Sequence, residues 1–193
     1  MLINTSDITS IHKSQFTGKE TEVCFNAEKS GVFHANKDVL LTKIIGDILP
    51  GKTIHFYSWA NFNLVKLILF VLKQTGPADI LMTSYSFSQK SIESLNSYKK
   101  SGLIKNIQVL IDNRVRVMSP KPFQMLISSF DYRCTSVHAK VALIWNEKWN
   151  ITIVTSQNAT DNPKLERGII FTDKSIFDFD FKTLTDEFLR GTA

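Results

Sequence analysis

A histidine and a lysine stand two residues apart in the apolar stretch formed by residues 137–145. Successive side chains on a strand alternate between its two faces, so His138 and Lys140 would project from the same face, about 7 Å apart. Burying an imidazole and an ammonium on an apolar strand costs several kcal/mol unless the groups are paired. The presence of the pair on this face therefore requires an explanation, which the neighbouring residues must supply.

The apolar stretch continues into an expected hairpin. Residues 146–148 lie between Trp145 and Trp149, and their composition predicts a tight turn followed by a return strand. If Trp145 pairs with Trp149, the ladder places Ser156 opposite His138. We expect this register, which brings the polar residues of the two strands to one patch.

Two more polar residues would complete the patch. Asn158 follows on the return strand, and Glu166 begins the next expected strand. A carboxylate there could accept the second ring N–H of His138 and fix the tautomer of the imidazole. A turn longer by one residue would instead put Gln157 opposite His138, so the convergence depends on the register.

These residue types can transfer a phosphoryl group without a metal. A ring nitrogen of His138 would attack phosphorus and form a covalent phosphohistidine, while Lys140 and Asn158 hydrogen-bond the non-bridging oxygens. Glu166 would orient the imidazole, Ser156 is a further candidate for phosphate contact, and a second acid must protonate the leaving oxygen. The competing interpretation is a satisfied core histidine, a lysine that reaches solvent, a capping hydroxyl and a surface carboxylate.

The elements that would position this patch alternate between strands and helices. The expected strands cover residues 21–26, 53–59, 79–87 and 106–112, the expected helices cover 39–48, 64–73, 89–100, 120–130 and 181–190, and 133–171 is strand-rich. This order predicts an α/β domain with a mixed β-sheet flanked by helices. No repeat or linker divides the 193 residues, so we expect a single domain in which residues 1–20 are a loose arm or an edge strand.

Composition limits the partners. The apolar fraction of 43% is typical of a soluble globular protein, and the net charge of +5 favours an anionic partner such as nucleic acid or a lipid headgroup surface. Cys24 and Cys134 lack metal-ligand spacing and are expected to be free thiols in a reducing compartment. We expect no metal, no cofactor and no transmembrane segment, because the most apolar run, residues 64–72, is too short to span a bilayer. The start of the chain lacks a signal-peptide pattern, which predicts a cytoplasmic protein.

The candidate residues resemble the signature of the phospholipase D-like superfamily. That signature is His-x-Lys, four residues and Asp, followed by Gly-Ser-x-Asn and a downstream Glu. Residues 138–140 match its first part, residues 155–158 match the second with Thr155 in place of Gly, and Glu166 stands at the downstream position. Trp145 occupies the place of the family's Asp. The specific motif is confined to residues 138–166, within a wider likeness over roughly residues 50–175, and it implies a layered α-β-α fold and phosphodiester cleavage.

Only one such motif is present in this chain. Family members with two motifs build one site from both, and a single-motif chain resembles the small bacterial endonucleases that dimerise to bring two histidines face to face. The resemblance therefore implies a C2 homodimer in which His138 of one subunit is the nucleophile and His138 of the other is the general acid.

Three functions stay open at this point. The first is a metal-independent phosphodiesterase or endonuclease that acts on DNA or RNA, and the second is a phospholipase or phosphatidyl transferase. The third is a nucleic-acid-binding module that has kept the scaffold and lost turnover, which the replacement at Trp145 allows. Residues 113–116 with Lys121 form either a phosphate-steering patch or a solvated surface, and Ser84, Ser86 and Ser88 form either a ligand site or a polar strand end.

Overall fold

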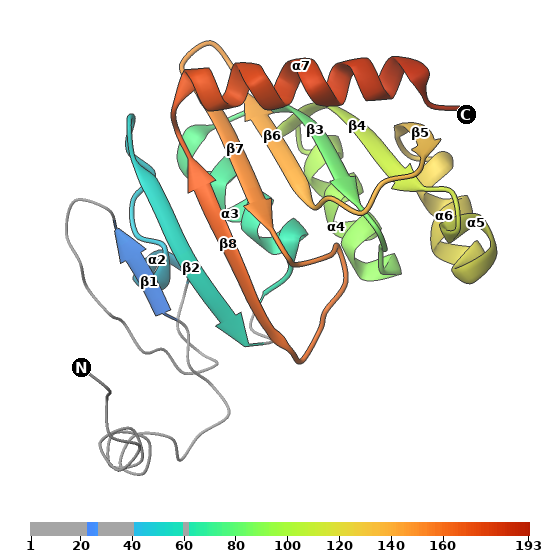
Figure 1. Ribbon diagram of the computed structural model, residues 1–193, viewed down its shortest axis with the longest axis horizontal. Helices are drawn as coiled ribbons and strands as arrows, with labels where there is room; N and C mark the ends of the chain where they lie inside the picture. Colours follow the sequence, from blue (N-terminus) through green and yellow to red (C-terminus); the bar gives the residue numbers. More distant parts are fainter. Residues whose placement is uncertain (1–22, 27–40, 60–61) are drawn as a thin grey trace, which may run out of the picture.

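The computed structural model describes residues 23–26, 41–59 and 62–193, and its centre is an eight-stranded mixed sheet (Figure 1). The strands are β1 (Val23–Asn26), β2 (Thr53–Trp59), β3 (Ala78–Ser84), β4 (Ile104–Asp112), β5 (Asp131–Thr135), β6 (Val141–Trp145), β7 (Asn150–Thr155) and β8 (Leu165–Phe171). Across the sheet their order is β1-β2-β8-β7-β6-β3-β4-β5. β4 pairs in parallel with β3 and with β5, and the other neighbours are antiparallel. The expected α/β class with a mixed sheet is confirmed.

Helices cover both faces of this sheet. They are α2 (Leu41–Ile44), α3 (Leu64–Thr75), α4 (Gln89–Lys100), α5 (Val115–Met118), α6 (Pro120–Ile127) and α7 (Lys174–Arg190). In Figure 1, α7 crosses one face, and α3 and α4 lie behind the sheet. The layered α-β-α arrangement predicted from the sequence is therefore present.

Strand β6 shows why the motif segment is so apolar. Ala142 and Ile144 belong to the large core that includes α3 and α4, and Val141 and Leu143 belong to the smaller cluster beneath α7. A strand that is buried on both faces has a continuous apolar sequence, because alternate side chains enter different cores. The same two-sided burial fixes the position of the residues just before β6.

The first described helix is shorter than its periodicity predicts. The expected helix covers residues 39–48, whereas α2 ends at Ile44, and residues 39–40 lie outside the described residues. Gly46 has a φ of 74°, in the left-handed region that ends a helix and that glycine adopts at little cost.

The last helix begins well before the expected range of 181–190, at Lys174. Asp173 caps it, because its side chain accepts hydrogen bonds from backbone N–H groups of the first turn. The extra turns add Phe177 to the contact that Phe181 makes with Trp145, and the two ring centroids lie 6.1 and 5.2 Å from that of the indole. Trp145 is therefore a packing residue between the sheet and α7.

The hairpin register differs from the expected one. Trp145 pairs with Asn150 and not with Trp149. The reason is the side chain of Asn146, whose Oδ1 accepts the backbone N–H groups of Lys148 and Trp149, each at 3.0 Å. This Asx-type turn is one residue longer than the predicted one, so the return strand is shifted by one position.

The shift changes which residues face the motif. Thr155 lies opposite Lys140, and its N–H donates to the Lys140 carbonyl at 3.0 Å. If this register is extended by two more residues, Gln157 lies opposite His138. The expected pairing of His138 with Ser156 is therefore wrong. His138 and Lys140 also precede β6 and do not form part of the strand.

The expected loose arm or edge strand at residues 1–20 lies outside the described residues, as does the side chain of Cys24. Cys134 is buried and its thiol is free. In the part of the chain that the structure describes, every helix is too short or too polar to cross a bilayer.

Candidate active site

The predicted site residues gather where β3 ends and β6 begins. Met82 near the end of β3 pairs with Ala142 near the start of β6 in the antiparallel ladder. The hydroxyl of Thr83 donates to the carbonyl of Ala139, which attaches the segment before β6 to β3. Ligands of open α/β sheets bind beyond the carboxyl ends of the strands, and this end of β3 and of its parallel neighbour β4 is such a place.

His138 and Lys140 are in direct contact. The Lys140 Nζ lies 3.2 Å from Nδ1 and 3.4 Å from Nε2 of the imidazole, and it donates to the His138 carbonyl at 2.6 Å. The His138 side chain is exposed, whereas Lys140 is only 8% exposed. The arrangement presents an accessible imidazole backed by a sheltered ammonium.

A carboxylate modulates the charge of Lys140. Burial lowers the pKa of the Lys140 ammonium, and the negative charge of Glu166 acts in the opposite direction. Glu166 is itself 9% exposed. Charges in such a sheltered place interact more strongly than they would in water, so Glu166 helps to keep Lys140 protonated.

Glu166 is held by two other side chains. The Ser156 hydroxyl donates to Oε2, and the Asn162 side-chain amide donates to Oε1 at 2.7 Å. Both carboxylate oxygens thus have partners, and within the described residues none of the hydrogen bonds of Glu166 reaches His138. The expected hydrogen bond between Glu166 and His138 is absent, because the turn that carries Asn162 folds back onto the carboxylate.

Asn158 is oriented by the end of β3. The Ser84 hydroxyl lies 3.4 Å from the Asn158 Oδ1 and accepts the Ala159 N–H at 3.0 Å. Among the described residues, the Nδ2 of the half-buried Asn158 donates to none. The carboxamide can therefore offer two N–H donors to an anion. From the sequence, Ser84 was either part of a ligand site or a polar strand end. In the structure its hydroxyl contacts the side chain of Asn158 and helps to hold it in position.

Some residues near the site were not identified from the sequence. The Tyr85 ring follows β3 and lies with its centroid 5.0 Å from that of His138, and the Lys140 Nζ lies 5.9 Å from the same tyrosine ring. Ser58 is fully buried opposite Glu166 in the β2–β8 ladder, and its Oγ has no partner in the described structure. Neither residue belongs to a recognisable motif, and only strand order brings them here.

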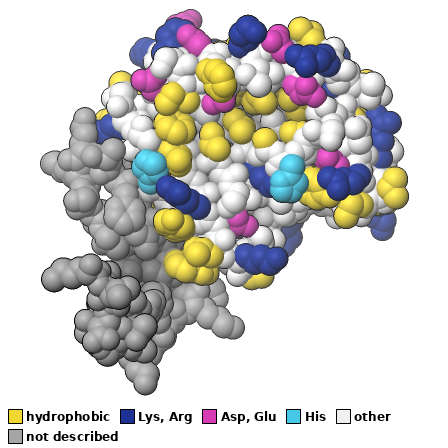
Figure 2. Space-filling model, viewed as in Figure 1, with side chains coloured by type: hydrophobic (Ala, Val, Ile, Leu, Met, Phe, Trp, Pro, Cys, Tyr) yellow, Lys and Arg dark blue, Asp and Glu magenta, His cyan; other side chains and the backbone are white. Residues whose placement is uncertain are grey.

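The exposed surface is consistent with an anionic ligand. Figure 2 shows histidine side chains on the viewed face, with Lys or Arg side chains beside them. Within the described ranges, no group of three or more His, Cys, Asp or Glu side chains is arranged to hold a metal ion.

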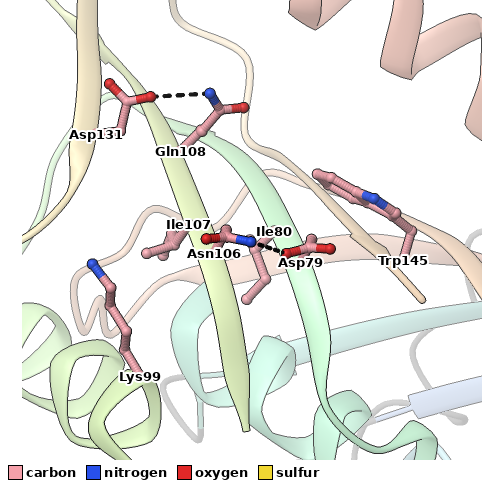
Figure 3. Close-up of a pocket in the computed structure, with 8 residues that line it drawn as sticks. All are labelled: Asp79, Ile80, Lys99, Asn106, Ile107, Gln108, Asp131 and Trp145. Atoms are coloured by element: carbon pink, nitrogen blue, oxygen red, sulfur yellow. Dashed lines mark hydrogen bonds between the residues drawn. The ribbon is translucent and has the colours of Figure 1, made fainter. Parts of the chain in front are cut away.

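A hollow of about 450 Å³ lies at the opposite end of β3 and β6 (Figure 3). Its lining residues are Asp79, Ile80, Lys99, Asn106, Ile107, Gln108, Asp131 and Trp145. The Asp79 carboxylate accepts a hydrogen bond from Asn106 at 2.7 Å, and that of Asp131 accepts one from Gln108 at 3.0 Å. This hollow is separate from the predicted site residues and carries carboxylates that would repel an anion.

Comparison with known proteins identifies the fold. No family model and no curated protein matches the sequence. Nuc from Salmonella typhimurium, a phospholipase D family member, superimposes with a TM-score of 0.54 at 19% identity, over 65% of this chain and 88% of Nuc. NucT from Helicobacter pylori gives 0.51 at 14% identity, over 66% of this chain and 88% of NucT. Polyphosphate kinase from Porphyromonas gingivalis gives 0.54 at 18% identity, over 74% of this chain and 26% of the kinase. The two-sided mixed sheet, with its polar residues at the junction of β3 and β6, is the phospholipase D-like fold.

Proposed function

We propose that this chain is a metal-independent phosphodiesterase that cleaves nucleic acid through a covalent phosphohistidine at His138, in a site completed by a homodimer. The observation that carries the proposal is the contact of an exposed imidazole with a buried ammonium, 3.2 Å from Nδ1 to Nζ, at the ligand-binding end of a phospholipase D-like sheet. An exposed ring can reach a substrate phosphorus, and a sheltered cation beside it can stabilise the charge that develops there.

Each remaining residue has a role that its contacts support. Lys140 and Asn158 supply N–H donors to the non-bridging oxygens of the phosphate. Glu166 keeps Lys140 charged and holds Ser156, whose hydroxyl lies at the edge of the site. This role for Glu166 replaces the orientation of His138 that its place in the motif implies.

The reaction takes two displacements. In the first, a ring nitrogen of His138 attacks phosphorus, the bond from phosphorus to the leaving oxygen breaks, and that oxygen takes a proton from a general acid. In the second, water attacks phosphorus and gives its proton to the same group, now a base. The P–N bond breaks and His138 returns to its free form.

The general acid is proposed to come from a second subunit. His55, the other histidine in the described ranges, lies on β2 opposite Ile169 and does not contact His138. An isologous dimer would place His138 of the partner subunit across the phosphate, because a two-fold axis brings the same residue from both chains to one point.

Nucleic acid is the substrate that the charge favours. The net charge of +5 attracts a polyanion at long range. The likeness to Nuc and NucT, which extends over 88% of each of those chains, is consistent with this choice.

The test is cleavage of end-labelled single-stranded DNA, double-stranded DNA and RNA in EDTA. We expect the wild-type protein to cut at least one of them, His138→Ala to lose all activity, and the matched control His55→Ala to retain it. A radiolabelled phosphate attached to the protein, stable in alkali and labile in acid, would identify the phosphohistidine. Cleavage that needs a divalent ion and survives His138→Ala would contradict the proposal.

Two alternatives give different results in the same assay. Hydrolysis of phospholipid vesicles without oligonucleotide cleavage would indicate a phospholipase, and tight binding without turnover would indicate a binding module. The dimer is tested by mass measurement in solution and by mixing His138→Ala with Lys140→Ala subunits. We expect no full recovery on mixing, because each shared site would still lack one part.

A further inference from the structure

The loop that follows β4 carries an arginine, Arg114, whose side chain is held in place by a buried carboxylate. Arg114 follows β4, and both its Nε and its backbone N–H donate to the Asp112 Oδ1, at 2.8 and 3.0 Å. The Asp112 side chain is 3% exposed, whereas that of Arg114 is 64% exposed. Hydrogen bonds from Arg114 hold the pKa of Asp112 below its ordinary value, and the backbone N–H of Val137 acts in the same direction. One buried carboxylate therefore connects this loop to the segment that carries His138.

Tyr85 lies between Arg114 and His138 and contacts both side chains. The Arg114 Cζ lies 4.9 Å above the Tyr85 ring, and the centroid of the His138 ring lies 5.0 Å from that of Tyr85. The guanidinium carbon can be no farther from the imidazole than the sum of these distances. Within this upper limit, the two side chains could reach phosphates about one or two nucleotides apart along a strand.

The guanidinium still has hydrogen bonds to give. An arginine side chain carries five N–H donors, and the bonds to Asp112 use Nε and, weakly at 3.5 Å, Nη2. In the described structure Nη1 donates to no residue. The stacking on Tyr85 and the bond to Asp112 hold one edge of the guanidinium in place, and its other edge faces solvent. Because the side chain is already held, it would lose little conformational entropy on binding a phosphate.

The surroundings of Arg114 suit a strand that carries bases as well as phosphates. Val117 and Met118 on α5 are 84% and 67% exposed, and the Tyr85 hydroxyl donates to the Met118 sulfur at 3.8 Å. Exposed apolar side chains next to a cation are what single-strand-binding grooves offer to base faces and backbone.

We propose that Arg114 binds a phosphate that neighbours the scissile one in a single nucleic-acid strand. This contact would make the site prefer a phosphodiester that has neighbouring phosphates in a strand to a small phosphodiester that has none. This inference rests on the proposed function, because it takes His138 as the position of the scissile phosphate. Asp112 and Tyr85 are positioning residues in it, and Arg114 is a specificity residue.

The first test compares two substrates. We expect Arg114→Gln to lower kcat/KM on a single-stranded oligonucleotide by about tenfold or more, the value of a lost charged hydrogen bond. Hydrolysis of bis(4-nitrophenyl) phosphate, which has one phosphate and no neighbour, should be unchanged. Arg116→Gln is the matched control. Arg116 lies on α5, which begins directly after Arg114, but its guanidinium carbon lies over the Phe123 ring at 5.6 Å, so both its rates should equal those of wild type.

The second test needs no turnover. In a His138→Ala background, the binding of a fluorescent oligonucleotide is titrated at several salt concentrations. Removing one phosphate contact should reduce the slope of log K against log salt by about 0.7 for a single strand, in Arg114→Gln and not in Arg116→Gln.

The outcomes separate the two proposals. An equal loss on both substrates, or an unchanged salt slope, would overturn the role of Arg114. Activity on both substrates that survives His138→Ala would overturn the proposed function, and the salt slope would still decide whether Arg114 contacts a phosphate. If Arg114→Gln lost binding to phospholipid vesicles but kept binding to oligonucleotides, the contact would be with a lipid headgroup.

Discussion

Strands β3 and β6 carry polar side chains at both ends, and the two ends differ in charge and in unused hydrogen-bonding capacity. At one end, Lys140 is buried beside an exposed His138, and the carboxamide N–H groups of Asn158 have no partner among the described residues. At the other end, the hollow of about 450 Å³ contains Asp79 and Asp131, which are already hydrogen-bonded to their neighbours.

Volume alone is a poor guide to the proposed phosphate site. An anion is stabilised by cations and by donors that have no other partner, and the end with His138 supplies both. The hollow has a defined volume of about 450 Å³, yet its carboxylates would repel a phosphate and each already accepts a hydrogen bond from a neighbouring amide. Chemistry is therefore expected at the end that carries His138, and substitutions there should have larger effects than matched substitutions elsewhere.

The largest difference is expected between two lysines. Lys140→Met should lower kcat/KM on single-stranded DNA by at least about a hundredfold, which is the cost of removing a donor to developing phosphate charge. Its melting temperature should not fall by much, because removing a buried charge also removes its desolvation cost. Lys99→Met, at the hollow, should keep wild-type kinetics. Equal losses in the two variants would mean that the two ends do not differ as described.

A smaller effect is expected from neutralising Glu166. Burial lowers the pKa of Lys140 and Glu166 raises it, so Glu166→Gln should lower that pKa further. In the proposed mechanism Lys140 donates to the phosphate only when it is protonated. The alkaline limb of the kcat/KM profile should therefore move to lower pH, with about a tenfold loss on that limb. The measurement is a pH–rate series on the oligonucleotide. Asp79→Asn, its counterpart in the hollow, should leave the limb in place, and a shift in that variant would argue against local control by Glu166.

The smallest effect is expected in acid unfolding. Arg114 holds the pKa of Asp112 below its ordinary value, so the stabilisation from this carboxylate is complete above pH 4 and is lost as the pH falls through the lower folded-state value. Asp112→Asn should reduce the free energy of unfolding by about 1 kcal/mol at pH 7, and by less in strong acid. Denaturant titrations at several pH values measure this. Asp131→Asn, which removes an exposed pair with Arg133, should change little at any pH.

Local pattern was sufficient to predict much of the fold. Helix α4 has the predicted bounds, β2 covers the predicted residues, and β3 and β4 lie within two residues of their predicted starts. These elements have clear periodicity or β-branched composition, and nearby residues alone set that signal. The same is true of the residue types in the motif, because His-x-Lys and Ser-x-Asn are visible without any fold.

Spatial relations between the motif residues depended on single contacts that no periodicity records. One side chain, Asn146, lengthens the turn and shifts the register, so Lys140 faces Thr155. Asn162 folds back and takes the carboxylate oxygen that was expected to bind His138. Each difference comes from a polar side chain that bonds to a nearby turn, where alternatives differ by only about 1 kcal/mol.

Strand order decided the rest of the site. β3 lies between β6 and β4 in the sheet, although β6 follows both in the chain. For that reason Tyr85 contacts His138, and Arg114 contacts Tyr85, although these residues come from elements that are distant in sequence. Residue types and spacing identified which groups could react. The packing of non-consecutive strands determined which of these groups meet. Long-range strand pairing depends on how the cores on both faces of the sheet are buried together, and no local stretch of sequence records it.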